Sequence, residues 1–198
     1  MNSLKGLRYS KVLIMTDADY DGFHIKGLII NFIDAGWPEL LKEIFIGSIL
    51  TPIVKVSKAT DKLSFYTHKD YITWKETEQA KGNWNTKYYK GLGTSTAQEA
   101  KEYFKNLRVL NYKNFDNNDS KSLELAFKKT EADSRKDWIR KNTEKFEGLD
   151  YNTKETISIS NLINKELVLF SISDNVRSIP SLVDGLKPGQ RKVLFASF

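Results

Sequence analysis

The sequence of 198 residues lacks cysteine altogether and contains only four prolines and two histidines. Without cysteine there can be no disulfide framework, no thiolate nucleophile and no cysteine-based metal site. No uninterrupted run of about 18 apolar residues occurs, so no membrane-spanning segment is expected. The first ten residues, MNSLKGLRYS, lack the apolar stretch of a secretory signal. These absences exclude the disulfide-rich, thiol-enzyme and membrane-spanning classes of protein.

The residues that are present describe a folded, basic chain. Hydrophobic residues make up 40% of the sequence and aromatic residues 12%, which excludes a disordered chain. The formal net charge is +6, and the sequence pI is about 9.2. Such an excess of positive charge is typical of a protein that binds phosphates, but it also occurs on ordinary basic surfaces. Charge alone leaves both interpretations open.

The first half of the sequence predicts strands that alternate with helices. Residues 11–16 have the apolar character of a buried strand, and residues 22–35 show helical spacing. Pro38 opens a short second helix, residues 49–56 predict another buried strand, and residues 62–66 predict its hairpin partner. The expected apolar stripe of the first helix consists of Ile25, Leu28, Ile29, Phe32 and Ile33.

The second half predicts more helix than strand. Residues 84–89 are aromatic and extended in character, and a glycine-punctuated loop follows at 91–94. Ser95 is expected to cap a helix that runs to about residue 107. The remaining prediction comprises a polar surface loop at 111–120, charged helices at 121–129 and 131–145, a linker at 148–158, an apolar stretch at 162–170 and a final helix that the chain end interrupts.

Three aspartates alternate directly after the first predicted strand, at Asp17, Asp19 and Asp21. Ligands of open α/β sheets bind beyond the carboxyl ends of strands, and three carboxylates at one point repel each other unless a cation neutralises them. Oxygen ligands suit Mg²⁺. An acidic surface turn bent at Gly22 is the simplest alternative. An EF-hand calcium loop is disfavoured because Leu28 stands where the glutamate at its twelfth position belongs.

A phosphatase of the haloacid dehalogenase kind is a further alternative for this acidic run. Its strand ends in a nucleophilic aspartate followed by DxT or DxV. The corresponding last position in this sequence is Asp21, which disfavours that class.

Four sequence blocks together resemble the eukaryotic-type type IIA DNA topoisomerases. The block LRYSKVLIMTDADYDGFHIKGLIINF resembles the second acidic motif of the TOPRIM domain in this family. The later blocks KYYKGLGTSTAQEAKEYF (87–104), AFKKTEADSRKDWI (126–139) and SISDNVRSIPSLVDGLKPGQRKVLF (171–195) resemble the same family in the same order. Many relatives read DQDHDG where this chain reads DADYDG, so the aspartates are kept while Ala18 and Tyr20 differ.

The resemblance implies an α/β fold with a TOPRIM-type, Rossmann-like sheet flanked by helices. It implies a TOPRIM domain at 1–110 that lacks its first strand–helix unit, a helical connector at 111–158 and the start of a winged-helix region at 159–198. The family is ATP-dependent and passes one DNA duplex through another. The catalytic tyrosine, the partner glutamate of the acidic motif and the ATP-binding domain would lie outside this chain, which alone is expected to be inactive.

The resemblance also implies the partners and cofactors. Asp17, Asp19 and Asp21 would contribute to a two-metal Mg²⁺ site, and double-stranded DNA, the remainder of the enzyme and a second copy in a homodimer would be the partners. The location would be the nucleus, or a viral replication site for a large DNA virus. A non-catalytic DNA-binding subunit of a split topoisomerase and a calcium-binding module are the alternative functions.

Most candidate DNA-binding residues are basic side chains near glycines, prolines or a helix start. Lys128 and Lys129 are candidates because of the family resemblance, since the balanced charge around them alone favours a solvated helix face. Contacts of this kind hold the phosphate backbone without reading bases. The residues are His24, Lys26, Lys87, Lys90, Lys128, Lys129, Arg177, Lys187, Arg191 and Lys192.

Overall fold

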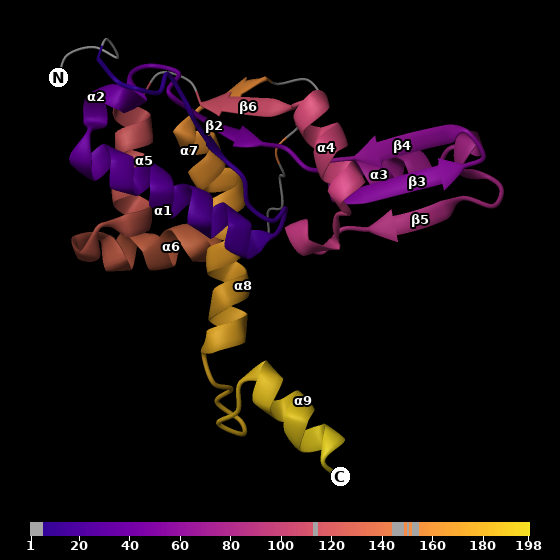
Figure 1. Cartoon of the computed structure of the whole chain (residues 1–198). Helices are drawn as coiled ribbons and strands as arrows, with labels where there is room; N and C mark the ends of the chain where they lie inside the picture. Colours follow the sequence, from indigo (N-terminus) through magenta and orange to yellow (C-terminus); the bar gives the residue numbers. More distant parts are fainter. Residues whose placement is uncertain (1–5, 113–114, 144–148, 150, 152–154) are drawn as a thin grey trace.

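A four-stranded mixed sheet forms the centre of the larger part of the molecule (Figure 1). The computed structural model describes residues 6–112, 115–143, 149, 151 and 155–198. The strands follow the order β1 (Val12–Ile14), β2 (Ile46–Ile49), β6 (Val109–Tyr112) and β7 (Thr156–Ile157). β1 is parallel to β2, β6 is antiparallel to β2, and β7 is parallel to β6. The sheet therefore joins segments from both halves of the sequence.

Helices cover this sheet because apolar side chains from all of them meet in one core. Ile30, Leu110, Leu123 and Leu162 are at most 1% exposed and belong to one continuous cluster. The helices around this core are α1 (Tyr20–Gly36), α2 (Pro38–Leu41), α5 (Asn117–Phe127), α6 (Ala132–Asn142), α7 (Ile159–Leu162) and α8 (Val168–Ser178). A π-helical segment, Ile163–Leu167, joins α7 to α8.

A second, three-stranded antiparallel sheet projects from the first (Figure 1). Its order is β4 (Asp61–Phe65), β3 (Val54–Lys58) and β5 (Asn85–Tyr88), and α3 (His68–Lys75) contacts it. Val54, Val56 and Tyr71 form its small separate core. The loop between β5 and α4 (Ala97–Lys105) contains a 3₁₀ turn, Leu92–Thr94. This loop returns the chain toward the first sheet.

The C-terminal segment extends away from both sheets. Figure 1 shows α8 leading out of the main body and α9 (Pro188–Ala196) lying at its far end. Leu182, Val183 and Phe195 are more than 80% exposed along this arm. Short 3₁₀ turns at Glu78–Ala80 and Lys129–Glu131 complete the described elements. No helix among the described residues is long and apolar enough to cross a membrane.

The predicted α/β class is confirmed, as are the first strand, the first two helices, the hairpin and the strand near residue 85. The strand predicted at 49–56 is wrong as one element. Residues up to Ile49 belong to the first sheet and residues from Val54 to the second, with Pro52 between them. Proline lacks a backbone N–H and interrupts the hydrogen-bond ladder of a strand.

Two further expectations are corrected at element boundaries. The surface loop expected at 111–120 is wrong for most of its described residues, because Asn111 and Tyr112 end β6 and α5 starts at Asn117. Thr96, rather than Ser95, caps α4. Residues 113–114 and most of the linker predicted at 148–158 lie outside the described residues.

The apolar stripe expected on α1 is wrong for most of its members. Ile30 and Ile33 are buried, whereas Ile25, Leu28 and Phe32 are 46%, 45% and 64% exposed. The helix turns a less apolar side, which includes a lysine and two glycines, toward the core. It thereby leaves apolar side chains uncovered on its opposite face.

Candidate metal and DNA-binding site

The acidic run lies at the carboxyl end of β1, where the chain turns into α1. Asp17 follows the strand, Asp19 is the N-cap of α1, and Asp21 lies in the first helical turn. The backbone N–H of Gly22 donates to Asp19 Oδ1 at 2.7 Å, which satisfies one of the amides at the helix start. All three aspartates line a cavity of about 430 Å³. A strand before the run and a helix at Leu28 do not match an EF-hand, where the calcium loop follows a helix.

A loop from a distant part of the sequence holds Asp17 in place. The backbone N–H of Leu92 donates to Asp17 Oδ1 at 2.6 Å. A Cβ atom at Gly91 would lie 2.7 Å from Asp17 Oδ2, so a larger residue at position 91 would push this carboxylate aside. Gly22 is more strongly constrained, because a Cβ atom there would lie 2.0 Å from the backbone oxygen of Asp17. The first aspartate therefore sits between two close backbone approaches.

Asp21 has a different partner, the guanidinium of Arg177 at the end of α8. Arg177 donates to both carboxylate oxygens of Asp21 at 2.9 and 3.1 Å, and to Asp174 at 3.0 Å. The hydrogen bond from Arg177 holds the pKa of Asp21 below its usual value. The pair joins the start of α1 to the end of α8, although 156 positions separate the two residues.

His24 lies beside this pair and stacks on an aromatic ring. Its imidazole lies 4.0 Å from the Phe170 ring at an interplanar angle of 9°. Partial burial lowers the pKa of His24, and the charges of Asp174 and Asp21 oppose that change. His24 is thus half-buried against α8.

The donor set of this cavity fits magnesium in part. Its side chains offer carboxylate and hydroxyl oxygens, and Mg²⁺ is usually held by one or two carboxylates together with water and phosphate. Within the described part of the chain, however, no three His, Cys, Asp or Glu side chains converge as a metal-binding group. Asp17 and Asp19 are the members of the run that would hold the ion, since Asp21 is paired with Arg177.

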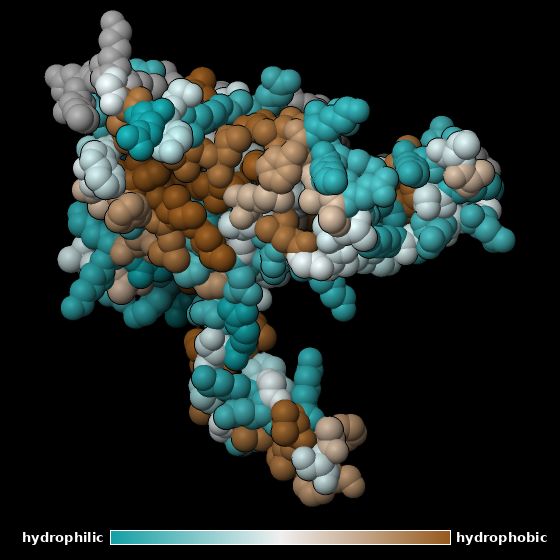
Figure 2. All heavy atoms as spheres, in the orientation of Figure 1, coloured by the Kyte–Doolittle hydropathy of each residue, from teal (hydrophilic) through white to brown (hydrophobic). Residues whose placement is uncertain are grey.

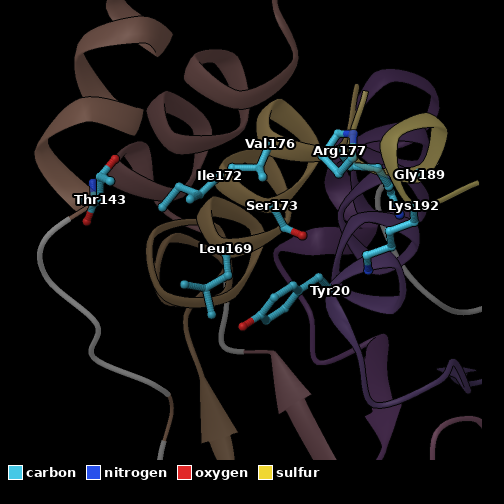
Figure 3. Close-up of a pocket in the computed structure, with 11 residues that line it drawn as sticks. Tyr20, Thr143, Leu169, Ile172, Ser173, Val176, Arg177, Gly189 and Lys192 are labelled. Atoms are coloured by element: carbon cyan, nitrogen blue, oxygen red, sulfur yellow. The ribbon is translucent and has the colours of Figure 1, made fainter. Parts of the chain in front are cut away.

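A second cavity, of about 600 Å³, lies between the start of α1, α8 and α9. Figure 3 shows the side chains of Tyr20, Arg177 and Lys192 near one another around it, with apolar side chains of α8 such as Leu169 and Ile172 beside them. Two of the predicted DNA-binding residues, Arg177 and Lys192, thus line one cavity next to the acidic run.

The other predicted DNA-binding residues differ in how they are held. Lys87 is paired with Glu99 at 2.9 Å, Lys128 with Glu124 at 3.3 Å, and Arg191 with Asp184 at 2.7 Å. The remaining candidates are exposed and comprise Lys90, Lys129, Lys187 and Lys192.

Lys26, a predicted DNA contact, is buried in this structure. Lys26 is 5% exposed and belongs to the side of α1 that faces the core. Its Nζ atom lies 5.2 Å from the centre of the Phe23 ring. The positive charge of Lys26 acts to lower the pKa of Glu166, which is also buried. The side chain of Lys26 thus lies beside Phe23 in the interior of the chain.

Two residues of the site, Glu99 and Asp174, were not predicted from the sequence. Glu99 accepts hydrogen bonds from both sides of the 91–94 loop, and the TxxE spacing of Thr96 and Glu99 is a capping box that the sequence does signal. Asp174 shares Arg177 with Asp21. No local sequence pattern predicts that contact, because it depends on the packing of α8 against α1.

Comparison with known proteins identifies the family of this chain. Residues 49–175 match the family model described as the C-terminal associated domain of TOPRIM. The chain is 51% identical to DNA topoisomerase 2-alpha of Rattus norvegicus over 209 aligned residues, which cover all of this chain and 14% of that protein. It is 50% identical to DNA topoisomerase 2 of Bombyx mori, covering 98% of this chain and 13% of the relative.

A solved structure agrees with the sequence relatives. The crystal structure of the DNA-binding, cleavage and re-ligation domain of Plasmodium falciparum topoisomerase II matches with a TM-score of 0.86 and 44% identity. That match covers 98% of this chain and 27% of the solved chain. The chain thus spans a small part of the length of its relatives. It belongs to the family described as the C-terminal associated domain of TOPRIM, and it is similar over nearly its whole length to eukaryotic type II DNA topoisomerases.

Proposed function

We propose that this chain is the central segment of an ATP-dependent type IIA DNA topoisomerase, which binds Mg²⁺ and grips duplex DNA during double-strand cleavage and religation. The observation that carries the proposal is the cavity at the end of β1, lined by Asp17, Asp19 and Asp21 and by Leu92, whose amide donates to Asp17. The catalytic tyrosine and the ATP-binding domain belong to other segments of the enzyme, so the chain alone is inactive.

Asp17 and Asp19 hold Mg²⁺ in this proposal. The ion would neutralise negative charge that develops at the scissile phosphate. The Leu92 amide fixes the carboxylate of Asp17, and the helix start fixes that of Asp19, so both are oriented before an ion arrives. Asp21 does not hold the ion in this proposal, and it stays paired with Arg177 beside the site. A second ion of a two-metal site would need the glutamate of the preceding strand–helix unit.

Duplex DNA is the proposed partner of the basic side chains around the acidic run. Arg177 and Lys192 line the cavity between α8 and α9, and Lys90 lies at the start of the glycine loop. Phosphate contacts of such side chains position a duplex without reading its sequence. His24, which is also a predicted DNA contact, is stacked on Phe170 of α8.

The remainder of the enzyme is the proposed partner of an apolar face on α1 and β1. Figure 2 shows hydrophobic side chains gathered over this part of the molecule, and Leu13, Ile25, Leu28 and Phe32 are between 36% and 64% exposed there. β1 also forms one edge of the four-stranded sheet. We assign this edge and face to the preceding strand–helix unit of the TOPRIM domain.

The intact enzyme acts as a homodimer in the nucleus.

A relaxation assay tests the proposed function. Supplying the segments that carry the tyrosine, the glutamate and the ATPase to this chain is expected to give Mg²⁺- and ATP-dependent relaxation of supercoiled DNA. The chain alone is expected to give none. A folded complex that binds DNA but never relaxes it would favour the alternative, a non-catalytic DNA-binding subunit of a split topoisomerase.

Calorimetry with Ca²⁺ and Mg²⁺ tests the calcium-binding alternative. A calcium module predicts submicromolar Ca²⁺ affinity without DNA, whereas two oriented carboxylates predict weak binding of both ions.

The relatives named above are animal and Plasmodium proteins, and none of them supports a viral replication site for this chain.

A further inference from the structure

The carboxylate of Glu99, near the start of α4, lies between the two ends of the loop at 91–94. It accepts hydrogen bonds from Lys87 Nζ at 2.9 Å and from the backbone N–H of Thr96 at 2.7 Å. The hydroxyl of Tyr89 also donates to it. Two of these donors precede the loop at 91–94 and one follows it, so a single side chain holds both ends of the loop together.

The surroundings of Glu99 favour its charged form. Its side chain is 17% exposed. Partial burial acts to raise its pKa, but the hydrogen bonds from Lys87, Thr96 and Tyr89 prevail and lower the pKa to about 2. Lys55 on β3 adds a second positive charge at 3.9 Å, while its Nζ atom lies 4.7 Å from the centre of the Tyr103 ring. The carboxylate is therefore held from three elements at neutral pH.

The loop that Glu99 closes is the one that contacts the acidic run. Within the loop, the N–H of Thr94 donates to Gly91 and the N–H of Ser95 donates to Leu92, at 3.0 and 3.1 Å. The N–H of Leu92 in turn donates to Asp17 Oδ1 at 2.6 Å. Gly91 and the Leu92 amide both lie against the carboxylate of Asp17, so a shift of the loop moves the donor that holds this carboxylate.

We propose that Glu99 is a positioning residue for the Mg²⁺ site. By tying Lys87 and Tyr89 to Thr96 it fixes the 91–94 loop, which orients the carboxylate of Asp17 through the Leu92 amide. Glu99 does not touch the ion or the DNA. The inference rests on the proposed function of Asp17 and extends it to a residue on another element. It also explains why Lys87, an expected DNA contact, is ion-paired within the chain.

The competing explanation is that Glu99 only caps α4. It belongs to a capping box in which Thr96 Oγ1 accepts from the Glu99 amide at 3.2 Å. Glutamine serves equally well at this position of a capping box. Glu99→Gln therefore keeps the cap but removes the charge that holds Lys87, which separates the two roles. Glu102→Gln is the matched control, since Glu102 is on the same helix, lies 3.9 Å from Lys55 and is 53% exposed.

The first measurement is hydrogen exchange of the segment around Leu92 in the intact, DNA-free protein. The proposal predicts that Glu99→Gln speeds exchange of the Leu92 amide about tenfold, because its hydrogen bond to Asp17 opens more often. Tyr89→Phe, which removes a different donor to the same carboxylate, is expected to act in the same direction. Glu102→Gln is expected to leave the exchange unchanged. Unchanged exchange in both Glu99→Gln and Tyr89→Phe overturns the proposal.

The second measurement is the Mg²⁺ concentration that gives half-maximal DNA cleavage by the intact protein. Glu99→Gln is expected to raise it about five- to tenfold with unaltered DNA affinity, the size expected from the loss of one typical intramolecular hydrogen bond. Asp17→Asn serves as the reference. If Asp17→Asn cleaves normally, the proposed function fails. If Asp17→Asn is inactive while Glu99→Gln matches the wild type, the role of Glu99 alone is refuted.

Discussion

Gly91 illustrates at the scale of one residue how the acidic run depends on a distant loop. A methyl group at this position would lie 2.7 Å from Asp17 Oδ2, well inside van der Waals contact. The φ angle of Gly91 is −178°, an extended conformation that any residue adopts. The requirement for glycine is therefore one of space beside Asp17 and not of backbone strain.

Gly91→Ala is expected to displace the carboxylate of Asp17 and to weaken Mg²⁺-dependent cleavage about tenfold or more. Gly93→Ala is the matched control, because nothing lies within 4 Å of a Cβ atom at that position. Cleavage of a labelled duplex over a range of Mg²⁺ concentrations measures both variants. Equal behaviour of the two alanine variants would show that the close approach to Asp17 has no functional weight.

Glu166 gives the chain a pH-dependent stability. The side chain is 3% exposed in the π-helical segment, where burial raises its pKa from 4.5 to about 7 while the charge of Lys26 acts to lower it. A carboxyl whose pKa is raised on folding stabilises the folded state below its unfolded pKa. That contribution is lost as the pH rises from about 4.5 to about 7, and it amounts to roughly 3 kcal/mol.

Glu166→Gln is expected to remove this pH dependence, because glutamine stays neutral. Urea unfolding of the wild-type chain and the variant at pH 4.5 and pH 8 measures it. Relative to the variant, the wild type should lose on the order of 3 kcal/mol between the two pH values. A constant difference between the two proteins would show that Glu166 titrates normally.

At the scale of elements, the sequence predicted the local structure better than the packing. The strand before Asp17, the helix after it and the hairpin near residue 60 follow from local periodicity and turn residues. The buried side of α1 did not, because periodicity marks an apolar stripe without saying which element covers it. In this chain Ile25 and Phe32 of that stripe are exposed, while Lys26 is buried.

The candidate site was also predictable only in part. Asp17, Asp19 and Asp21 follow from spacing alone, and the structure places all three around one cavity. Their partners come from contacts across 75 and 156 positions of sequence, from Leu92 and Arg177. Such contacts arise when distant elements pack together, so no local pattern encodes them.

The basic side chains of the C-terminal arm allow a prediction for α9 as an element. Lys187 and Lys192 are exposed, whereas Arg191 is tied to Asp184 by two hydrogen bonds at 2.7 and 2.8 Å. If both lysines contact phosphates, the double variant Lys187→Ala/Lys192→Ala lowers the slope of log affinity against log salt by about two. Arg191→Ala should change the slope less, because its charge is already paired.

Fluorescence anisotropy with a labelled duplex between about 50 and 200 mM salt measures these slopes. The affinity loss should be similar for duplexes of different sequence, since phosphate contacts do not read bases. An unchanged slope in the double variant would place the DNA path away from α9.

At the scale of the whole molecule, the acidic run lies where three parts of the chain meet. The first sheet supplies Asp17, the loop behind the second sheet supplies the Leu92 amide, and the end of α8 supplies Arg177. Movement of any of these parts changes the surroundings of a carboxylate in the run. This arrangement links the proposed DNA contacts on α8 and α9 to the proposed metal site.

The substitution Asp17→Asn in the intact protein tests the central claim most directly. It removes one negative charge at nearly constant size, and phosphate contacts elsewhere supply most of the DNA affinity. Cleavage and binding are measured on the same duplex at increasing Mg²⁺ concentration. The account predicts that the variant binds DNA within about twofold of the wild type and does not cleave it. Wild-type cleavage by Asp17→Asn across that range would contradict the account.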